Sequence, residues 1–229
     1  MGDVMKRLRA RLSFGYGGWT GLGKAAVLAF GLCAAPSWAE EVVIAALGDS
    51  LTQGYGLPTD QGFVPQLEAW LQARGHEVRL INAGVSGDTT AGGLARIGWT
   101  LTGDVQALIL ALGGNDLLRG LPPEAARANL SGILSAAEAA GVQVLLVGLE
   151  APLNYGPDYK AAFDAIYPDL AAEYGVLYAE SFLAPVTAAP DLRAVMQADG
   201  IHPNATGVAL IVEALGPRVE ALIAQVQPP

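Results

Sequence analysis

Five short apolar runs recur along the chain and are separated by longer stretches that contain polar positions. The runs span residues 42–47, 78–82, 107–112, 142–148 and 176–179. Each run is almost continuously apolar instead of alternating with polar residues, which is typical of strands that are buried on both faces. The pattern therefore predicts five buried strands.

The segments between these runs carry apolar residues at helical spacing. Between residues 62 and 75, for example, Val64, Leu67 and Leu71 lie on one face of a helix, and residues 122–141 repeat the pattern. Strands that alternate with helices predict a parallel sheet with helices on both faces. We therefore expect a single α/β domain with three layers, α/β/α, built on a flavodoxin-like five-stranded parallel sheet.

Residues 1–39 differ from the rest of the chain. Basic residues precede an apolar run of about 11 residues, 25–35, which suits the core of a signal peptide and is too short to span a bilayer comfortably. Ser37 and Ala39 supply the small residues that a cleavage site needs. We predict a signal peptide that is cleaved after Ala39, a mature domain over residues 40–229, and a periplasmic or secreted location. An uncleaved membrane anchor is the alternative.

Cleavage would change the charge and the cysteine content. The whole chain has a net charge of −9, and loss of five of its 13 basic and one of its 22 acidic residues would leave 8 and 21, or −13. Such an acidic protein is repelled by nucleic acids and anionic membranes, so we expect neither as a partner. The single cysteine, Cys33, would be removed with the signal peptide.

The sequence does not indicate an oligomeric state, so we expect a monomer by default.

Polar, glycine-rich clusters follow the predicted strands at the points where the strands end. They read GDSLTQG after residue 47, AGVSGDTT after residue 82 and GGND after residue 112, and ADGIHPN comes near the end of the chain. Open parallel sheets bind their ligands at the carboxyl ends of the strands. These clusters are therefore expected to share one site.

The clusters contain the groups that serine hydrolysis needs. The chain has two histidines, and His76 precedes a predicted strand, at the opposite edge of the sheet from the clusters. His202 lies in the last cluster with Asp199 three residues earlier, so one turn can present a carboxylate to the imidazole ring. We predict Ser50 as nucleophile, His202 as base and Asp199 as the group that orients the base. Each motif taken alone could also simply form a turn, because Gly, Asp, Ser and Pro are common turn residues.

Two further groups could stabilise a developing oxyanion together with the Ser50 N–H. Gly87 would offer a second backbone N–H with space for a substrate, and Asn115 would offer its side-chain amide. We therefore predict an oxyanion hole made by Ser50, Gly87 and Asn115.

The sequences GDSLTQGYG, SGDTT, GGND and DGIHPN resemble the four sequence blocks of the SGNH, or GDSL, hydrolases. In that family the four defining residues are those at Ser50, Gly87, Asn115 and His202 here, and Asp199 completes the triad. The chain resembles the periplasmic thioesterase/lysophospholipase/arylesterase branch along nearly the whole mature part. The resemblance implies the SGNH hydrolase fold and hydrolysis of aryl and acyl esters, acyl-CoA thioesters or lysophospholipids through an acyl-enzyme, with no metal or other cofactor.

Two further segments are candidates for binding a small-molecule ester, thioester or lysophospholipid substrate. Residues after the GGND cluster are expected to form a mobile substrate loop, and residues after the fourth strand are expected to line the cleft. The candidate residues are Leu117, Leu118, Arg119, Leu153, Asn154 and Tyr155.

Several other polar and aromatic residues are expected to be structural. Asp49 should accept hydrogen bonds from N–H groups of the turn beside Ser50, and Asp88 and Asp116 should cap the helices that follow their strands. Trp70 and Trp99 are expected in the core.

Three alternatives stay open. One is a carbohydrate O-deacetylase of the same family. The second is a metal-dependent phosphoesterase, because hard metal ions prefer oxygen ligands; it would use Asp49, Asp116, Asp199, Asn115 and His202. The third is a flavodoxin-like binding module whose glycine loops hold a phosphate at a helix N-terminus.

Overall fold

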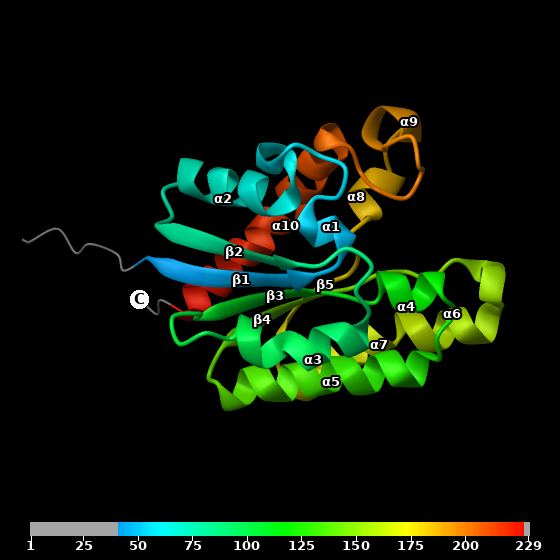
Figure 1. Ribbon diagram of the computed structural model, residues 1–229, viewed down its shortest axis with the longest axis horizontal. Helices are drawn as coiled ribbons and strands as arrows, with labels where there is room; N and C mark the ends of the chain where they lie inside the picture. Colours follow the sequence, from blue (N-terminus) through cyan, green and yellow to red (C-terminus); the bar gives the residue numbers. More distant parts are fainter. Residues whose placement is uncertain (1–40, 227–229) are drawn as a thin grey trace, which may run out of the picture. The chain divides into compact units, whose positions relative to one another are not determined.

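The computed structural model describes residues 41–226, and the predicted signal peptide lies outside this range. The described chain forms a five-stranded parallel sheet in the order β2-β1-β3-β4-β5 (Figure 1). The strands are β1 Val42–Gly48, β2 Val78–Gly84, β3 Ala107–Ala111, β4 Gln143–Val147 and β5 Leu177–Ala179. The predicted fold class and the five strands are confirmed.

Helices cover both faces of the sheet, as Figure 1 shows. On one face α2 (Phe63–Ala73) packs against α10 (Ala205–Val226), and on the other α3 (Thr90–Thr100) and α7 (Ile166–Tyr174) pack against α5 (Pro123–Ala139). The shorter helices are α1 Ser50–Gln53, α4 Gly114–Leu118, α6 Pro157–Asp164, α8 Ala184–Thr187 and α9 Leu192–Val195, and the 3₁₀ turns are Thr59–Gln61 and Leu153–Tyr155.

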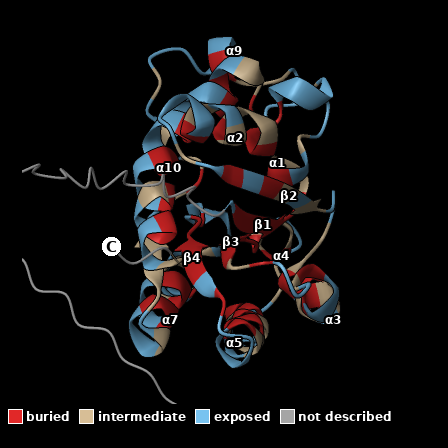
Figure 2. Cartoon of the chain, turned by 90° about the vertical axis from the view of Figure 1, so that its left-hand side faces the viewer, coloured by how far each residue is buried: buried red, intermediate tan, exposed pale blue. Residues whose placement is uncertain are grey.

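Burial follows the apolar runs of the sequence. All seven residues of β1 and all five of β3 are buried, whereas the edge strand β2 mixes buried and exposed positions. Figure 2 shows the buried residues concentrated in the central strands and on the helix faces that cover them. The prediction of burial on both faces is confirmed for the central strands β1 and β3, whose two faces are covered by helices. It is wrong for the edge strands β2 and β5, which keep exposed or partly buried positions.

Asp88 and Asp116 were predicted to cap the helices that follow their strands, and neither is the N-cap residue of that helix. Thr89 is the N-cap residue of α3, while Asp88 forms an ion pair with Arg96 at 2.7 Å. Asp116 is 1 % exposed and accepts hydrogen bonds from the backbone N–H and the hydroxyl of Thr90, at 2.8 and 2.7 Å. Asp116 thus ties the end of β3 to the start of α3, a contact between segments that sequence spacing does not reveal.

The prediction for the tryptophans was wrong for one of the two. Trp99 lies on α3 and is 87 % exposed. Trp70 is partly buried between α2 and α10, and its ring lies so close to Gly216 that any side chain there would collide with it. None of the helices within residues 41–226 combines the length and the apolar character that a membrane crossing requires.

Candidate active site

Ser50 lies where β1 gives way to α1. Gly48 ends the strand, Asp49 is the N-cap residue of α1, and the Asp49 Oδ1 atom accepts the N–H of Leu51 at 3.0 Å. A β-carbon at Gly48 would come within 1.9 Å of the Thr52 hydroxyl oxygen, so only glycine leaves room for Thr52 to pack against the end of the strand. The turn places Ser50 at the carboxyl edge of the sheet, as predicted.

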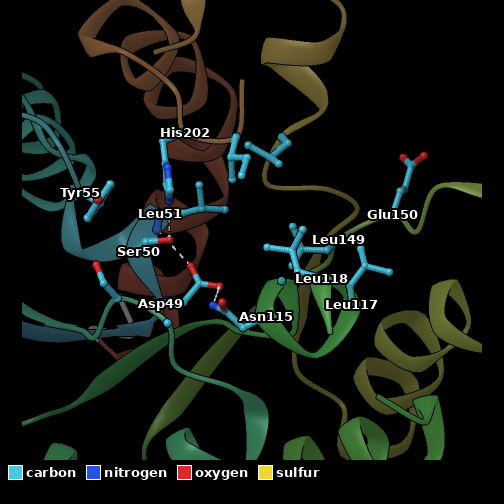
Figure 3. Close-up of a pocket in the computed structure, with 15 residues that line it drawn as sticks. Asp49, Ser50, Leu51, Tyr55, Asn115, Leu117, Leu118, Leu149, Glu150 and His202 are labelled. Atoms are coloured by element: carbon cyan, nitrogen blue, oxygen red, sulfur yellow. Dashed lines mark hydrogen bonds between the residues drawn. The ribbon is translucent and has the colours of Figure 1, made fainter. Parts of the chain in front are cut away.

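A chain of hydrogen bonds joins Ser50, His202 and Asp199. The His202 Nε2 atom lies 2.8 Å from the Ser50 Oγ atom (Figure 3). The His202 Nδ1 atom lies 2.6 Å from Asp199 Oδ2. Asp199 Oδ1 also accepts the backbone N–H groups of Ile201 and His202 at 2.9 and 3.0 Å. The hydrogen bond from the ring, followed by those from the backbone, lowers the pKa of Asp199 to about 2, so its carboxylate is charged at neutral pH.

The loop that carries His202 is tied down on two sides. The Gln197 N–H donates to the His202 carbonyl at 2.8 Å, and the Gln197 side-chain amide donates to the carbonyls of Tyr55 and Pro203 at 2.8 and 3.0 Å. The ring of Tyr55 packs beside that of His202, with 4.7 Å between their centroids. These contacts hold the imidazole ring over the start of α1.

The three predicted oxyanion donors lie around the same cleft, which Ser50, Gly87 and Asn115 all line. Among residues 41–226 the N–H groups of Ser50 and Gly87 donate to no protein acceptor. Gly87 has a φ of +82°, which favours glycine, and its carbonyl accepts the Arg119 guanidinium at 2.8 Å. The Asn115 amide donates to Asp49 Oδ2 at 3.4 Å. Two free N–H groups and one oriented amide are thus available to a ligand.

The cleft beside Ser50 has a volume of about 350 Å³ and an apolar wall. Leu117 and Leu118 line it, as expected for the substrate loop. The other four residues proposed to bind substrate are not part of its lining; they are Arg119, Leu153, Asn154 and Tyr155. Arg119 instead supports Gly87, and the Tyr155 hydroxyl donates to the Leu118 carbonyl at 3.3 Å. Their contact with substrate stays a prediction.

Sequence reasoning missed other residues that line the cleft. They are Leu51, Tyr55, Ser86, Leu149, Glu150, Leu183 and Ile201. Leu149 and Glu150 directly follow the fourth apolar run, so their place at the end of a strand was a usable signal. Tyr55 and Leu183 come from loops, whose course the apolar pattern does not determine.

Asp49 is a buried carboxyl beside the catalytic candidates, with an exposed fraction of 2 %. Burial raises its pKa to about 6, although the Leu51 N–H and the charge of protonated His202 act in the opposite direction. Asp49 therefore serves as the predicted turn cap and also adds negative charge near the imidazole.

The phosphoesterase alternative requires several of these groups to share one ion. Asp116 accepts two hydrogen bonds from Thr90, and Asp199 pairs with His202. Within residues 41–226, no group of three or more His, Cys, Asp or Glu side chains is placed to hold a metal ion.

The raised pKa of Asp49 predicts a pH-dependent effect of Asp49→Asn on stability. The folded pKa of about 6 exceeds the 3.8 of a free aspartate, so the carboxyl stabilises the fold at low pH, and this contribution is lost as pH rises through 6. Relative to wild type, Asp49→Asn should gain about 2 kcal/mol in unfolding free energy between pH 4 and pH 7.5. Urea unfolding at both pH values measures this, with Asp60→Asn at an exposed carboxyl as control. A difference that does not change with pH would contradict the account.

Known proteins share the fold of this chain. The family model described as "GDSL-like Lipase/Acylhydrolase family" matches residues 46–210. The chain is 40% identical to esterase TesA of Pseudomonas aeruginosa over 77% of this chain and 87% of that protein. It is 36% identical to thioesterase 1/protease 1/lysophospholipase L1 of Escherichia coli over 77% and 83% of the two chains. The crystal structure of AlinE4, an SGNH-hydrolase family esterase, has 45% identity and a TM-score of 0.67 over 84% of this chain and all of that one. The chain therefore belongs to the GDSL-like lipase/acylhydrolase family.

Proposed function

We propose that the protein hydrolyses carboxylic esters and thioesters through an acyl-enzyme formed on Ser50. The observation that carries this proposal is the hydrogen-bond chain from Ser50 through His202 to Asp199. Family membership supports it, as do the names of the esterase and of the thioesterase 1/protease 1/lysophospholipase L1 reported above. A further relative, 38% identical over 78% of this chain and 87% of that protein, is an arylesterase of Vibrio mimicus.

In the first step the Ser50 oxygen attacks the carbonyl carbon while His202 Nε2 takes the hydroxyl proton. Asp199 fixes the ring orientation and balances the positive charge that the ring acquires. The N–H groups of Ser50 and Gly87 and the amide of Asn115 bind the oxyanion; loss of one such donor typically lowers turnover by about 10²–10³-fold. The tetrahedral intermediate then collapses, and His202 gives its proton to the departing alcohol or thiol.

In the second step water hydrolyses the acyl-enzyme. His202 Nε2 takes a proton from the water as its oxygen attacks the ester carbonyl, and the same donors bind the second oxyanion. Collapse breaks the bond to the Ser50 oxygen, which takes the proton back from His202, and the carboxylic acid leaves. This sequence consumes one water, and every proton is carried by the imidazole.

The cleft favours substrates with an acyl chain. Leu117, Leu149 and Leu183 line it, and apolar side chains gain by contact with methylene groups. Acyl-CoA thioesters and lysophospholipids offer such a chain, and aryl esters offer an apolar ring. The O-acetyl group of a carbohydrate offers only one methyl group on a polar sugar. We therefore propose acyl or aryl esters and thioesters as the substrate class.

The nucleophile assignment predicts that Ser50→Ala folds normally but hydrolyses p-nitrophenyl butyrate about 10⁴-fold more slowly or worse. A fluorophosphonate probe should label the wild type and not the variant. Circular dichroism provides the folding control, and assays with and without EDTA test the phosphoesterase alternative. Turnover that survives Ser50→Ala would require a different nucleophile, and loss of activity with EDTA would favour the metal mechanism.

We also propose that the enzyme is exported and that residues 1–39 are removed. The basic start, the apolar run of about 11 residues and the small residues at Ser37 and Ala39 support this. Expression of the full chain in a Gram-negative bacterium should give a periplasmic protein whose N-terminal residue is Glu40, as read by mass spectrometry. A protein that keeps residues 1–39 and sediments with membranes would favour the anchor alternative.

A further inference from the structure

One carboxylate in the cleft has no part in the proposed mechanism. Glu150 follows β4, is exposed and lines the same cleft as Ser50. In Figure 3 it lies on the far side of the cleft from Ser50, and Leu117, Leu118 and Leu149 lie between them. The wall near Glu150 is otherwise apolar, so a fixed charge there must influence which groups can bind.

Two basic side chains lie close to residues of the cleft lining or to their chain neighbours, and both are engaged elsewhere. The Lys160 ammonium donates to Asp164 at 2.6 Å and to the Ala151 carbonyl at 2.8 Å. The Arg119 guanidinium donates to the Gly87 carbonyl. Among residues 41–226, no basic side chain forms a salt bridge with Glu150.

The surroundings of Glu150 are also acidic. Burial and the charges of nearby carboxylates raise the pKa of Tyr178; the carboxylates are those of Glu180, Asp164 and Glu150. The charge of Glu150 is therefore not neutralised locally, and it is available to a ligand in the cleft.

The position of His202 indicates which part of the substrate meets Glu150. A second groove, of about 830 Å³, shares Leu118, Leu183 and Ile201 with the cleft and is walled by α8, α9 and the loop that leads to His202. His202 must deliver its proton to the leaving atom, so the leaving group lies on the side of this groove. The acyl group then extends along the other arm, past Leu117 and Leu149 to Glu150.

We propose that Glu150 is a specificity-determining residue that selects acyl groups by charge. It favours an acyl chain with a cationic far end and disfavours one with an anionic far end. This inference rests on the ester hydrolysis proposed above. The charge lies away from the reacting carbonyl and acts equally on bound substrate and transition state, so the preference should appear in KM more than in kcat.

Three p-nitrophenyl esters of matched length provide the test: the hexanoate, the 5-(trimethylammonio)pentanoate and the adipate monoester. They share a leaving group and differ in the charge at the far end of the acyl chain.

In the wild type the kcat/KM of the cationic ester should exceed that of the anionic ester by about tenfold at low salt. Glu150→Gln should lower this ratio about three- to tenfold, and Glu150→Lys should invert it. Raising the salt to 1 M, where the screening length is about 3 Å, should compress the wild-type ratio.

Glu213→Gln is the matched control, because Glu213 is exposed on α10, does not line the cleft, and its substitution changes the net charge equally. Its charge ratio should stay that of the wild type. An equal fall in both Gln variants would assign the preference to the overall negative charge and overturn the role of Glu150. The role of Glu150 would also be overturned if Glu150→Gln left the ratio of kcat/KM for the cationic and anionic esters unchanged. Failure of the wild type to hydrolyse the neutral hexanoate would instead count against the proposed function.

Discussion

A hydrogen bond of 2.8 Å between His202 Nε2 and Ser50 Oγ joins two residues that are 152 positions apart in the chain. The bond exists because parallel strands share a direction, so the loops after them meet at one edge of the sheet. β1 brings Ser50 to that edge, and the bonds of Gln197 hold the loop that brings His202. The oxyanion donors also depend on this pair, because they can act only if they face the oxygen of the carbonyl that Ser50 attacks.

The same edge of the sheet holds polar groups that a stable core would avoid. Asp49 is almost completely buried, and burial raises its pKa to about 6, so its ionised form lowers the stability of the fold at neutral pH. Its carboxylate accepts the Asn115 amide and places a negative charge near His202. Asp116 is buried as well, but it accepts two hydrogen bonds from Thr90 and so fixes the start of α3, which follows the Gly87 loop in the chain. One buried carboxylate thus supports the chemistry, and the other supports the loop geometry.

The fold and the placement of the five main site residues could be predicted from the sequence, for a physical reason. Continuous apolar runs identify buried parallel strands, and the direction of those strands then places every following cluster at one edge. Spacing could not show that Asp116 would reach Thr90 on another segment, because that contact depends on how two loops pack. It also could not place Trp99, since a large apolar side chain is tolerated on a surface helix.

The structural account predicts where an inhibitor that mimics the tetrahedral intermediate must sit. A crystal structure of the protein after inactivation by a fluorophosphonate should show phosphorus bonded to the Ser50 oxygen. One phosphoryl oxygen should lie within hydrogen-bonding distance of the N–H groups of Ser50 and Gly87 and of the Asn115 amide, and His202 should still contact Asp199. Phosphorus on another residue, or a phosphoryl oxygen turned away from all three donors, would contradict the account.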